Sequence, residues 1–254
     1  MKKLSVLILS LLAITLFTSC SDNDEPVNKQ TVSSTINSRA ISGEDVIFSQ
    51  GTAKVEINFT DMTIQFAYDY KGIDEMTHTL TTPVMKLTMK SGSIYSFKSS
   101  DAKGPQGNID LATGMMSFSF TLDGDANVYS TTHLLYAYTN TKITNPDNGF
   151  TYDHNQSAYL FALDASGESC VMKISNFSPN TAGAVEAAEI QYNGLNVTPT
   201  TQGYIITAPE VSPVGYTGFY IITDLNVILD SQCNTIGGTF KCNDLEFNIT
   251  GNMF

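Results

Sequence analysis

The feature that most constrains the fold is a strict alternation of apolar and polar residues in short runs. In the clearest stretch the apolar positions are Ala53, Val55, Ile57 and Phe59 and, after a turn at 60–62, Ile64, Phe66, Tyr68 and Tyr70. A period of two places alternate side chains on opposite faces of a strand. This stretch therefore predicts a β-hairpin with one buried face and one face in water.

The same period recurs along the first half of the chain. Further alternating sets are Met85, Leu87 and Met89, then Tyr95 and Phe97, and finally Met116, Phe118, Phe120 and Leu122. The chain holds 12 Tyr and 14 Phe but only 15% charged residues, a composition that favours strands. The sequence predicts an all-β, antiparallel fold whose units are sandwich-like or half-barrel sheets.

The second half repeats the landmarks of the first. The first landmark, Val32-Ser33-Ser34-Thr35, returns as Val128-Tyr129-Ser130-Thr131, and the hairpin of 53–68 returns at 158–174 with its turn at 165–167. The third landmark, Leu87-Thr88 before Gly92, returns as Val197-Thr198 before Gly203. The fourth, Phe120-Thr121-Leu122-Asp123-Gly124, returns as Phe247-Asn248-Ile249-Thr250-Gly251. Four landmarks in the same order indicate an internal duplication, with repeats at 31–125 and 126–254; chance similarity between β-rich segments is the alternative. One short helical turn is expected at 181–190, where alanines accumulate.

Charge excludes two classes of partner. The formal net charge is −12 at pH 7, and removal of Lys2 and Lys3 with a leader would leave 11 basic against 25 acidic residues, about −14. A field of that sign repels nucleic acid and anionic lipid head groups, so no nucleic-acid partner is expected.

The N-terminus has the features of a secretory signal. Lys2 and Lys3 precede an apolar run that ends at Phe17, and small residues lead to Cys20. The run is too short and wrongly flanked for a membrane span. Its end, Leu16-Phe17-Thr18-Ser19-Cys20, resembles the bacterial lipobox, which implies a signal peptide at 1–19, acylation of Cys20 and a membrane partner through the acyl chains.

The residues after Cys20 form an acidic spacer. The segment Ser21-Asp22-Asn23-Asp24-Glu25-Pro26 within the tether 20–30 is similar to the tracts that send Bacteroidetes lipoproteins to the cell exterior; the alternative is a solvated spacer only. Asp is absent directly after the cysteine, where enteric lipoproteins carry an inner-membrane retention signal. The chain resembles β-rich, sometimes calycin-like Bacteroidetes surface lipoproteins, and the resemblance implies an outer-membrane location.

The remaining cysteines divide by context. Cys233 and Cys242 flank an expected hairpin turn at 235–238, so a disulfide between them and a pair of free buried thiols are both open. Cys170 shares a strand face with Met172 and Ile174, which predicts a buried thiol.

Catalytic signatures are missing. The sequence has no nucleophile elbow, no zinc-protease motif and no phosphate-binding glycine loop, and no catalytic residue or cofactor is assigned. His78, His133 and His154 lack ordinary zinc spacing, and His154 beside Asp153 is expected to be a solvated loop residue. Acidic residues such as Glu56, Asp61 and Asp164 fall on outward strand positions or in turns. The chain is therefore expected not to be an enzyme.

One segment resembles the opening of a calcium loop. Asp123, Asp125 and Asn127 place oxygen ligands at alternate positions, but the expected glycine and the distal glutamate are missing. An Asp- and Gly-rich turn between the repeats is favoured over a metal site.

Two loops of the second half carry exposed-type aromatics. The segment 213–220 places Tyr216, Phe219 and Tyr220 among glycines, and the segment 145–152 carries Phe150 and Tyr152. Aromatic side chains on a glycine-hinged loop can form a binding lip, so Phe150, Tyr152, Tyr216 and Tyr220 are candidate ligand-binding residues. Phe219 itself is expected to begin a strand through Leu229 and to point inward.

These observations favour a non-enzymatic surface binding module for a small apolar or glycan ligand. A structural or accessory subunit of a surface adhesin or nutrient-uptake assembly, with a protein partner, is the alternative. A large interior cavity would favour the first function, and exposed edge strands or a large apolar patch would favour the second.

Overall fold

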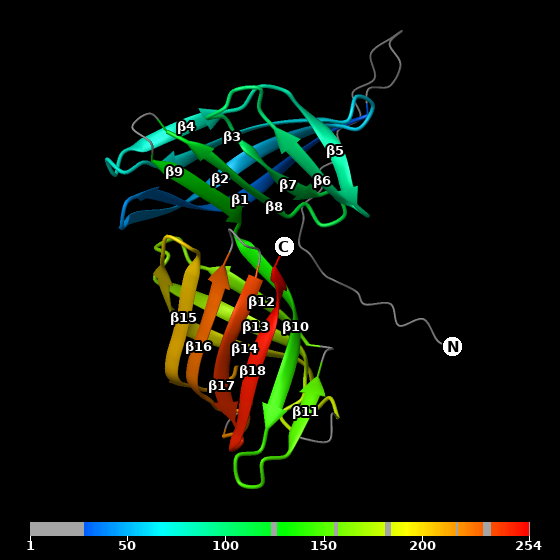
Figure 1. Ribbon diagram of the computed structural model, residues 1–254, viewed down its shortest axis with the longest axis vertical. Helices are drawn as coiled ribbons and strands as arrows, with labels where there is room; N and C mark the ends of the chain where they lie inside the picture. The colour runs from blue at the N-terminus through cyan, green and yellow to red at the C-terminus, as the bar shows by residue number, and fades with distance from the viewer. Residues whose placement is uncertain are drawn as a thin grey trace.

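The computed structural model describes residues 28–122, 126–154, 157–180, 184–216, 218–230 and 235–253 of the 254-residue chain. All regular structure in these ranges is β-strand, arranged in two antiparallel sheets that follow one another along the chain (Figure 1). The prediction of an all-β fold in two tandem units is confirmed. Over the same ranges there is no helix of sufficient length and apolar character to cross a membrane.

The first sheet uses the strands up to residue 132. They are β1 (Lys29–Ser42), β2 (Asp45–Asn58), β3 (Thr63–Lys71), β4 (Thr77–Thr81), β5 (Met85–Ser91), β6 (Ile94–Lys98), β7 (Gln106–Asp110), β8 (Met116–Thr121) and β9 (Asn127–Thr132). The order is β2-β1-β9-β8-β7-β6-β5-β3-β4, and a pairing of β2 with β3 closes the sheet on itself. The closure is uneven, because β3 pairs with β5 at two positions only and then continues with β4.

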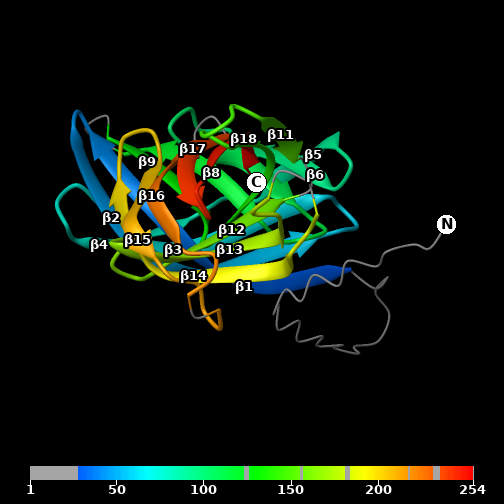
Figure 2. The same cartoon turned by 90° about the horizontal axis from the view of Figure 1, so that it is seen from below.

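The second sheet forms a complete eight-stranded barrel. Its strands are β10 (Leu134–Thr144), β11 (Thr151–His154), β12 (Ala158–Leu163), β13 (Ser169–Phe177), β14 (Ala187–Pro199), β15 (Tyr204–Val211), β16 (Ile222–Asp230), β17 (Thr235–Cys242) and β18 (Leu245–Met253). Pairing of β10 with β18 along Ala137–Thr144 closes the barrel, and β11 is added outside on β10. In Figure 2, which views the molecule from below, β12 to β18 curve around a common interior.

The predicted hairpin at 53–70 is confirmed with its register. Ala53 pairs with Tyr68 and Ile57 with Ile64, and the alternate residues named above face the core of the first sheet. The turn includes Met62 at a φ of 50°. The sheets change over at His133, after β9 has paired with both β1 and β8, whereas the duplication predicted from the sequence places its boundary between 125 and 126.

Two local predictions are wrong. The segment expected to turn as a helix contains Ala187–Ile190, which lie in β14, while Ala184–Glu186 have no regular structure and 181–183 lie outside the described residues. The turn expected at 235–238 lies inside β17, which pairs with β16 and β18 along its length. β-branched and aromatic neighbours extend the strand through Gly237 and Gly238.

The extended β17 bears on the two alternatives for Cys233 and Cys242, a disulfide or free buried thiols. Thr235 and Cys242 lie at opposite ends of this strand, which separates them by roughly 23 Å at the usual rise per residue. A disulfide requires Cα atoms within about 7 Å of one another. Cys242 is buried with a free thiol, and Cys233 lies outside the described residues. The hairpin expected at 235–238, which would have brought the flanking segments together, is therefore not formed.

The two sheets pack through the outer face of β1, β2 and β9. In the middle of β1, Ile36 to Ala40 are all buried, because one side of the strand faces the first core and the other faces the upper end of the second barrel (Figure 1). On the outer side, Arg39 donates from Nη1 to the carbonyl oxygen of Thr200. Gln50 Nε2 donates to Asn37 Oδ1 at 2.8 Å and to the Leu163 carbonyl at 3.2 Å.

Aromatic rings surround this interface. The guanidinium carbon of Arg39 lies 5.8 Å from the ring centroid of Tyr129 and 5.1 Å from that of Tyr204, distances suited to cation–π attraction. Burial lowers the pKa of Arg39, opposed by Tyr204 and by the charge of Asp230. Phe48 of β2 packs edge-on against Tyr204 at 6.2 Å. One sheet therefore caps one end of the other.

Candidate ligand-binding site

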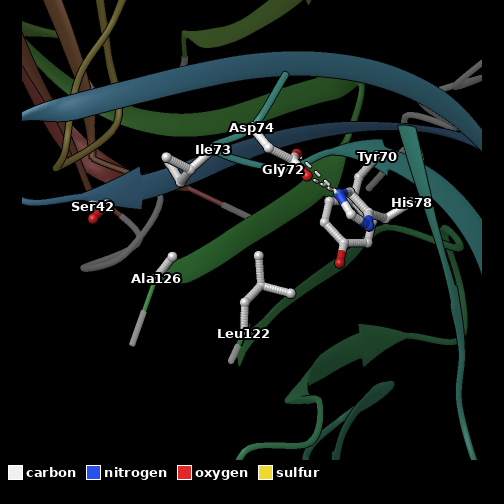
Figure 3. Close-up of a pocket in the computed structure, with 8 residues that line it drawn as sticks. All are labelled: Ser42, Tyr70, Gly72, Ile73, Asp74, His78, Leu122 and Ala126. Atoms are coloured by element: carbon white, nitrogen blue, oxygen red, sulfur yellow. Dashed lines mark hydrogen bonds and ion pairs between the residues drawn. The ribbon is translucent and has the colours of Figure 1, made fainter. Parts of the chain in front are cut away.

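A pocket of about 580 Å³ opens at the end of the first sheet, between the β1–β2, β3–β4 and β8–β9 connections. Figure 3 shows the residues that line it, which are Ser42, Tyr70, Gly72, Ile73, Asp74, His78, Leu122 and Ala126. Polar groups gather on one side around His78, and Ile73, Leu122 and Ala126 supply an apolar wall. We refer to this pocket as the mouth.

The β3–β4 connection sets the polar side of the mouth. Glu75 adopts a φ of 59°, and its N–H donates to the Gly72 carbonyl at 3.0 Å, which closes a tight turn. The Asp74 carboxylate accepts from the N–H of Met76 at 3.1 Å. This turn directs the carboxylate back toward β4, where His78 Nε2 lies 3.0 Å from both carboxylate oxygens.

The imidazole of His78 is held on its other side by Tyr70. The two rings are stacked with centroids 5.7 Å apart and an interplanar angle of 27°. Tyr70 is buried, and its ring also meets Phe120 edge-on at 5.3 Å. Three side chains thus form a layered cluster, with Tyr70 against the first core, His78 stacked on Tyr70, and Asp74 bonded to His78 (Figure 3).

The electrostatics of this cluster fix its hydrogen-bonding character. The hydrogen bond from His78 holds the pKa of Asp74 below its usual value, so the carboxylate is an ionised acceptor at neutral pH. Burial, and then the charge of Asp74, raise the pKa of Tyr70 above its usual value. The phenol therefore stays protonated and can donate. The cluster offers an acceptor and a donor side by side.

A second pocket of about 450 Å³ adjoins the mouth and shares Tyr70 and Leu122 with it. It lies between β4 and the β6–β7 connection, where β4 has left the neighbourhood of β5. Leu80, Pro83, Pro105 and Phe120 give it apolar surface, and Thr79, Ser99, Asp101 and Lys103 give it polar groups. The two pockets form one region around Tyr70 where the first sheet is incompletely closed.

The aromatic residues predicted from the sequence lie elsewhere, at the end of the second barrel far from the first sheet. The β10–β11 and β15–β16 connections meet this end. Tyr216 and Tyr220 are brought together with ring centroids 5.4 Å apart. Tyr152 and Tyr220 pack against the second core, whereas Phe150 is 55% exposed. The expectation for Phe219 is wrong, since β16 begins at Ile222 and Phe219 is 67% exposed.

Other predicted residues are placed as follows. Cys170 is buried on one face of β13 with Met172 and Ile174, as predicted. His154 is not a solvated loop residue, because it belongs to β11 and its Nε2 lies 3.0 Å from the Asn176 carbonyl. Asn127 lies in β9. Asp123, Asp125 and Cys20 lie outside the described residues. In the described part of the chain, no three metal-ligating side chains of His, Cys, Asp or Glu are grouped.

The sequence did not reveal the Asp74–His78 pair. The available signal was an Asp and a His four residues apart shortly after Gly72, but this spacing belongs to no zinc motif. The alternation predicts that Tyr70 faces inward, yet it does not show that this position borders an opening. That depends on where β4 and β5 diverge, which no local pattern records.

Comparisons with known proteins give little further support. No family model matches the chain, and no curated protein matches it. Among solved structures, the crystal structure of the isotype 1 transferrin binding protein B from serogroup B Neisseria meningitidis is similar, with a TM-score of 0.25 and 11% identity, over 89% of this chain and 75% of that chain. A TM-score of this size carries no argument about the present chain.

Proposed function

We propose that the protein is a non-enzymatic binding module whose ligand occupies the mouth of the first sheet. The observation that carries this proposal is the pocket of about 580 Å³ with a convergent polar cluster and an apolar wall. Concave sites of this size with few placed polar groups are the usual form of small-molecule sites. The ligand is a small amphipathic molecule with a neutral or cationic polar group.

The lining defines that ligand class. The ionised Asp74 carboxylate accepts hydrogen bonds and rejects anions, in keeping with the net charge of −12. The Tyr70 hydroxyl donates, and Ile73 and Leu122 contact an apolar portion. A hydroxylated ligand with an apolar part satisfies all of these groups.

The geometry supports binding over hydrolysis. His78 directs Nε2 to Asp74, so only Nδ1 is left to act on a substrate. The serine hydroxyl that lines the same pocket is that of Ser42, and Figure 3 places it across the mouth from His78. Nucleophilic catalysis needs the nucleophile within hydrogen-bond reach of its base.

We also propose that the chain is a surface lipoprotein of the outer membrane, with a signal peptide at 1–19, acylated Cys20 and a tether at 20–30. Two or three acyl chains anchor a protein far more firmly than one. Cys20→Ser is expected to abolish incorporation of labelled palmitate and to move the protein out of the membrane fraction. Palmitate incorporation into Cys20→Ser equal to that of the native protein would contradict this assignment.

The binding proposal is tested with N-phenyl-1-naphthylamine, a neutral apolar fluorophore, on the Cys20→Ser protein so that acyl chains do not compete for the probe. The native mouth is expected to give saturable fluorescence. Ser42→Trp places an indole at an exposed position that lines the mouth, and it should weaken probe binding about tenfold, or 1.4 kcal/mol.

Ser91→Trp is the matched control. Ser91 also ends a strand before a glycine with positive φ, Gly92 at 55° against Gly43 at 62°, but it lies at the opposite end of the first sheet. Its probe affinity should equal that of the native protein. Equal affinities in Ser42→Trp and Ser91→Trp, or no saturable binding at all, would refute the mouth as the ligand site.

A further inference from the structure

A group of exposed aromatic side chains lies at the far end of the second barrel, on the connection between β15 and β16. Tyr216 is 36% exposed and Phe219 is 67% exposed, and Tyr220 is half-buried between them and the core. Tyr216 meets Tyr220 at 5.4 Å between ring centroids, and Phe219 meets it at 6.4 Å. We refer to Tyr216, Phe219 and Tyr220 as the aromatic platform.

The platform is held rigidly by the barrel beneath it. The Tyr220 carbonyl accepts from the hydroxyl of Tyr192 at 2.8 Å, and the Tyr220 ring meets Phe177 edge-on at 6.0 Å. Tyr192 is fully buried in the second core, and Val214 N–H donates to the Gln191 carbonyl at 2.8 Å. These contacts hold Tyr220 in place against the barrel, which reduces the entropic cost of ordering this residue on binding.

The backbone of the platform is strained. Tyr220 adopts a φ of 56°, a region that bulky residues avoid, and Gly215 and Gly218 adopt φ values of 82° and 77°. A large side chain in this region is strained and persists where the surroundings enforce the conformation. Here the enforced conformation keeps three aromatic rings at the rim.

Acceptor groups border the platform. Asn180 Nδ2 donates to Glu186 Oε1 at 2.7 Å and to the Ala184 carbonyl at 2.8 Å, which fixes the segment that carries Glu186. Desolvation, and then the adjacent Glu186 carboxylate, raise the pKa of Tyr220 above its usual value. The Tyr220 hydroxyl therefore remains a donor beside the Glu186 carboxylate.

We propose that the aromatic platform, with Glu186, binds a neutral glycan chain. Sugar rings present C–H groups that stack on aromatic faces and hydroxyls that pair with carboxylates and amides. The platform supplies both kinds of group within one rigid surface. The net charge of −12 opposes anionic polysaccharides, so the ligand is uncharged. This site is separate from the mouth and belongs to the other sheet.

The test is affinity electrophoresis of the full chain in native gels that contain a soluble α-glucan, β-glucan, mannan or xylan. At least one of these is expected to retard the native protein. Phe219→Ala should weaken the retardation about tenfold, because it removes an exposed stacking surface. Glu186→Gln keeps the shape of the side chain and removes its charge, and it should also weaken retardation.

Two controls locate the effect. Tyr138→Ala removes an aromatic residue of β10 that is 55% exposed and lies outside the platform, and Ser42→Trp blocks the mouth. Both should be retarded as strongly as the native protein. Since Phe219 is exposed, its variant is expected to fold, and an unchanged melting temperature verifies this.

Retardation of the native protein by none of the four glycans would overturn the proposal. So would equal retardation of Phe219→Ala, or stronger retardation by a uronic-acid polysaccharide than by any neutral one. A loss of retardation in Ser42→Trp alone would move glycan binding to the mouth.

Discussion

The two sheets have the same strand count and the same antiparallel pairing, yet they close differently. In the second sheet β10 and β18 are paired continuously along Ala137–Thr144. In the first sheet the corresponding closure rests on Thr63–Lys86 and Ile64–Met85, after which β4 replaces β5 as the partner of β3. The pocket beside the mouth lies beyond the point where that pairing stops, between β4 and the β6–β7 connection. Incomplete closure therefore enlarges the open region beside the mouth, which shares Tyr70 and Leu122 with it.

The interior of the second sheet is closely packed. The second core contains large, fully buried side chains, namely Tyr159, Tyr192, Tyr204, Phe161, Phe177 and Phe240. Phe240 and Phe247 stack with centroids 4.5 Å apart. One end of this barrel is covered by the first sheet, and the other carries the aromatic platform. The first sheet thus has an open mouth, and the second sheet has a filled core that supports the aromatic platform.

The largest expected effect comes from the interface that joins the sheets. Arg39→Ala removes a buried cation that faces Thr200, Tyr204 and the charge of Asp230. The free energy of unfolding is expected to fall by about 3 kcal/mol, since buried polar partners lose their counterpart. Urea unfolding measures this loss. Lys54→Ala, an exposed cation on β2, should stay within about 0.5 kcal/mol of the native protein; equal effects would contradict the role of Arg39.

The closure of the second barrel is tested at a glycine. A Cβ on Gly251 would overlap the carbonyl oxygen of Tyr138 on β10, whereas a Cβ on Gly237 meets nothing within 4 Å. Gly251→Ala is expected to lower the free energy of unfolding by about 2 kcal/mol, because a packed strand pair must separate. Gly237→Ala should have little effect. If thermal unfolding shows the two variants to be alike, the β10–β18 pairing does not limit stability.

The smallest expected effect concerns the turn that meets the first sheet. The Asp164 carboxylate accepts from the hydroxyls of Ser169 and Ser166, which lower its pKa to about 2. A lowered pKa in the folded state gives stability that is present above the unfolded pKa, near 4, and is lost as the pH falls toward about 2. Asp164→Asn should cost less than about 1 kcal/mol at pH 7, given the exposure of this carboxylate.

The pH dependence of the melting temperature checks this expectation. The difference between the native protein and Asp164→Asn should shrink from pH 4 toward pH 2. A difference that stays constant over this range would show that the asparagine changes packing and that the charge of Asp164 does not contribute.

The sequence predicted the strands better than their closure. Alternation in 53–70 is a local property, so the hairpin and its register followed from it. Closure depends on residues far apart, such as Ala137 meeting Met253, and no period reports such pairs. His154 was misjudged because its partner, the Asn176 carbonyl, comes from another strand.

The candidate sites show the same limit. The sequence identified Tyr216 and Tyr220 from their glycine neighbours, and the structure brings their rings together. It misplaced Phe219 because the loop, with Gly218 at positive φ, runs on to Ile222 before β16 begins. Asp74 and His78 were missed because a turn, and no recognisable motif, brings them together.

β1 runs from the point where the chain enters the first sheet to the edge of the mouth. The chain enters the first sheet at Lys29, and Ser42, where β1 ends, borders the mouth. At the usual rise per residue this strand spans roughly 43 Å. A point of attachment before Lys29 would therefore lie at the opposite end of this strand from the opening.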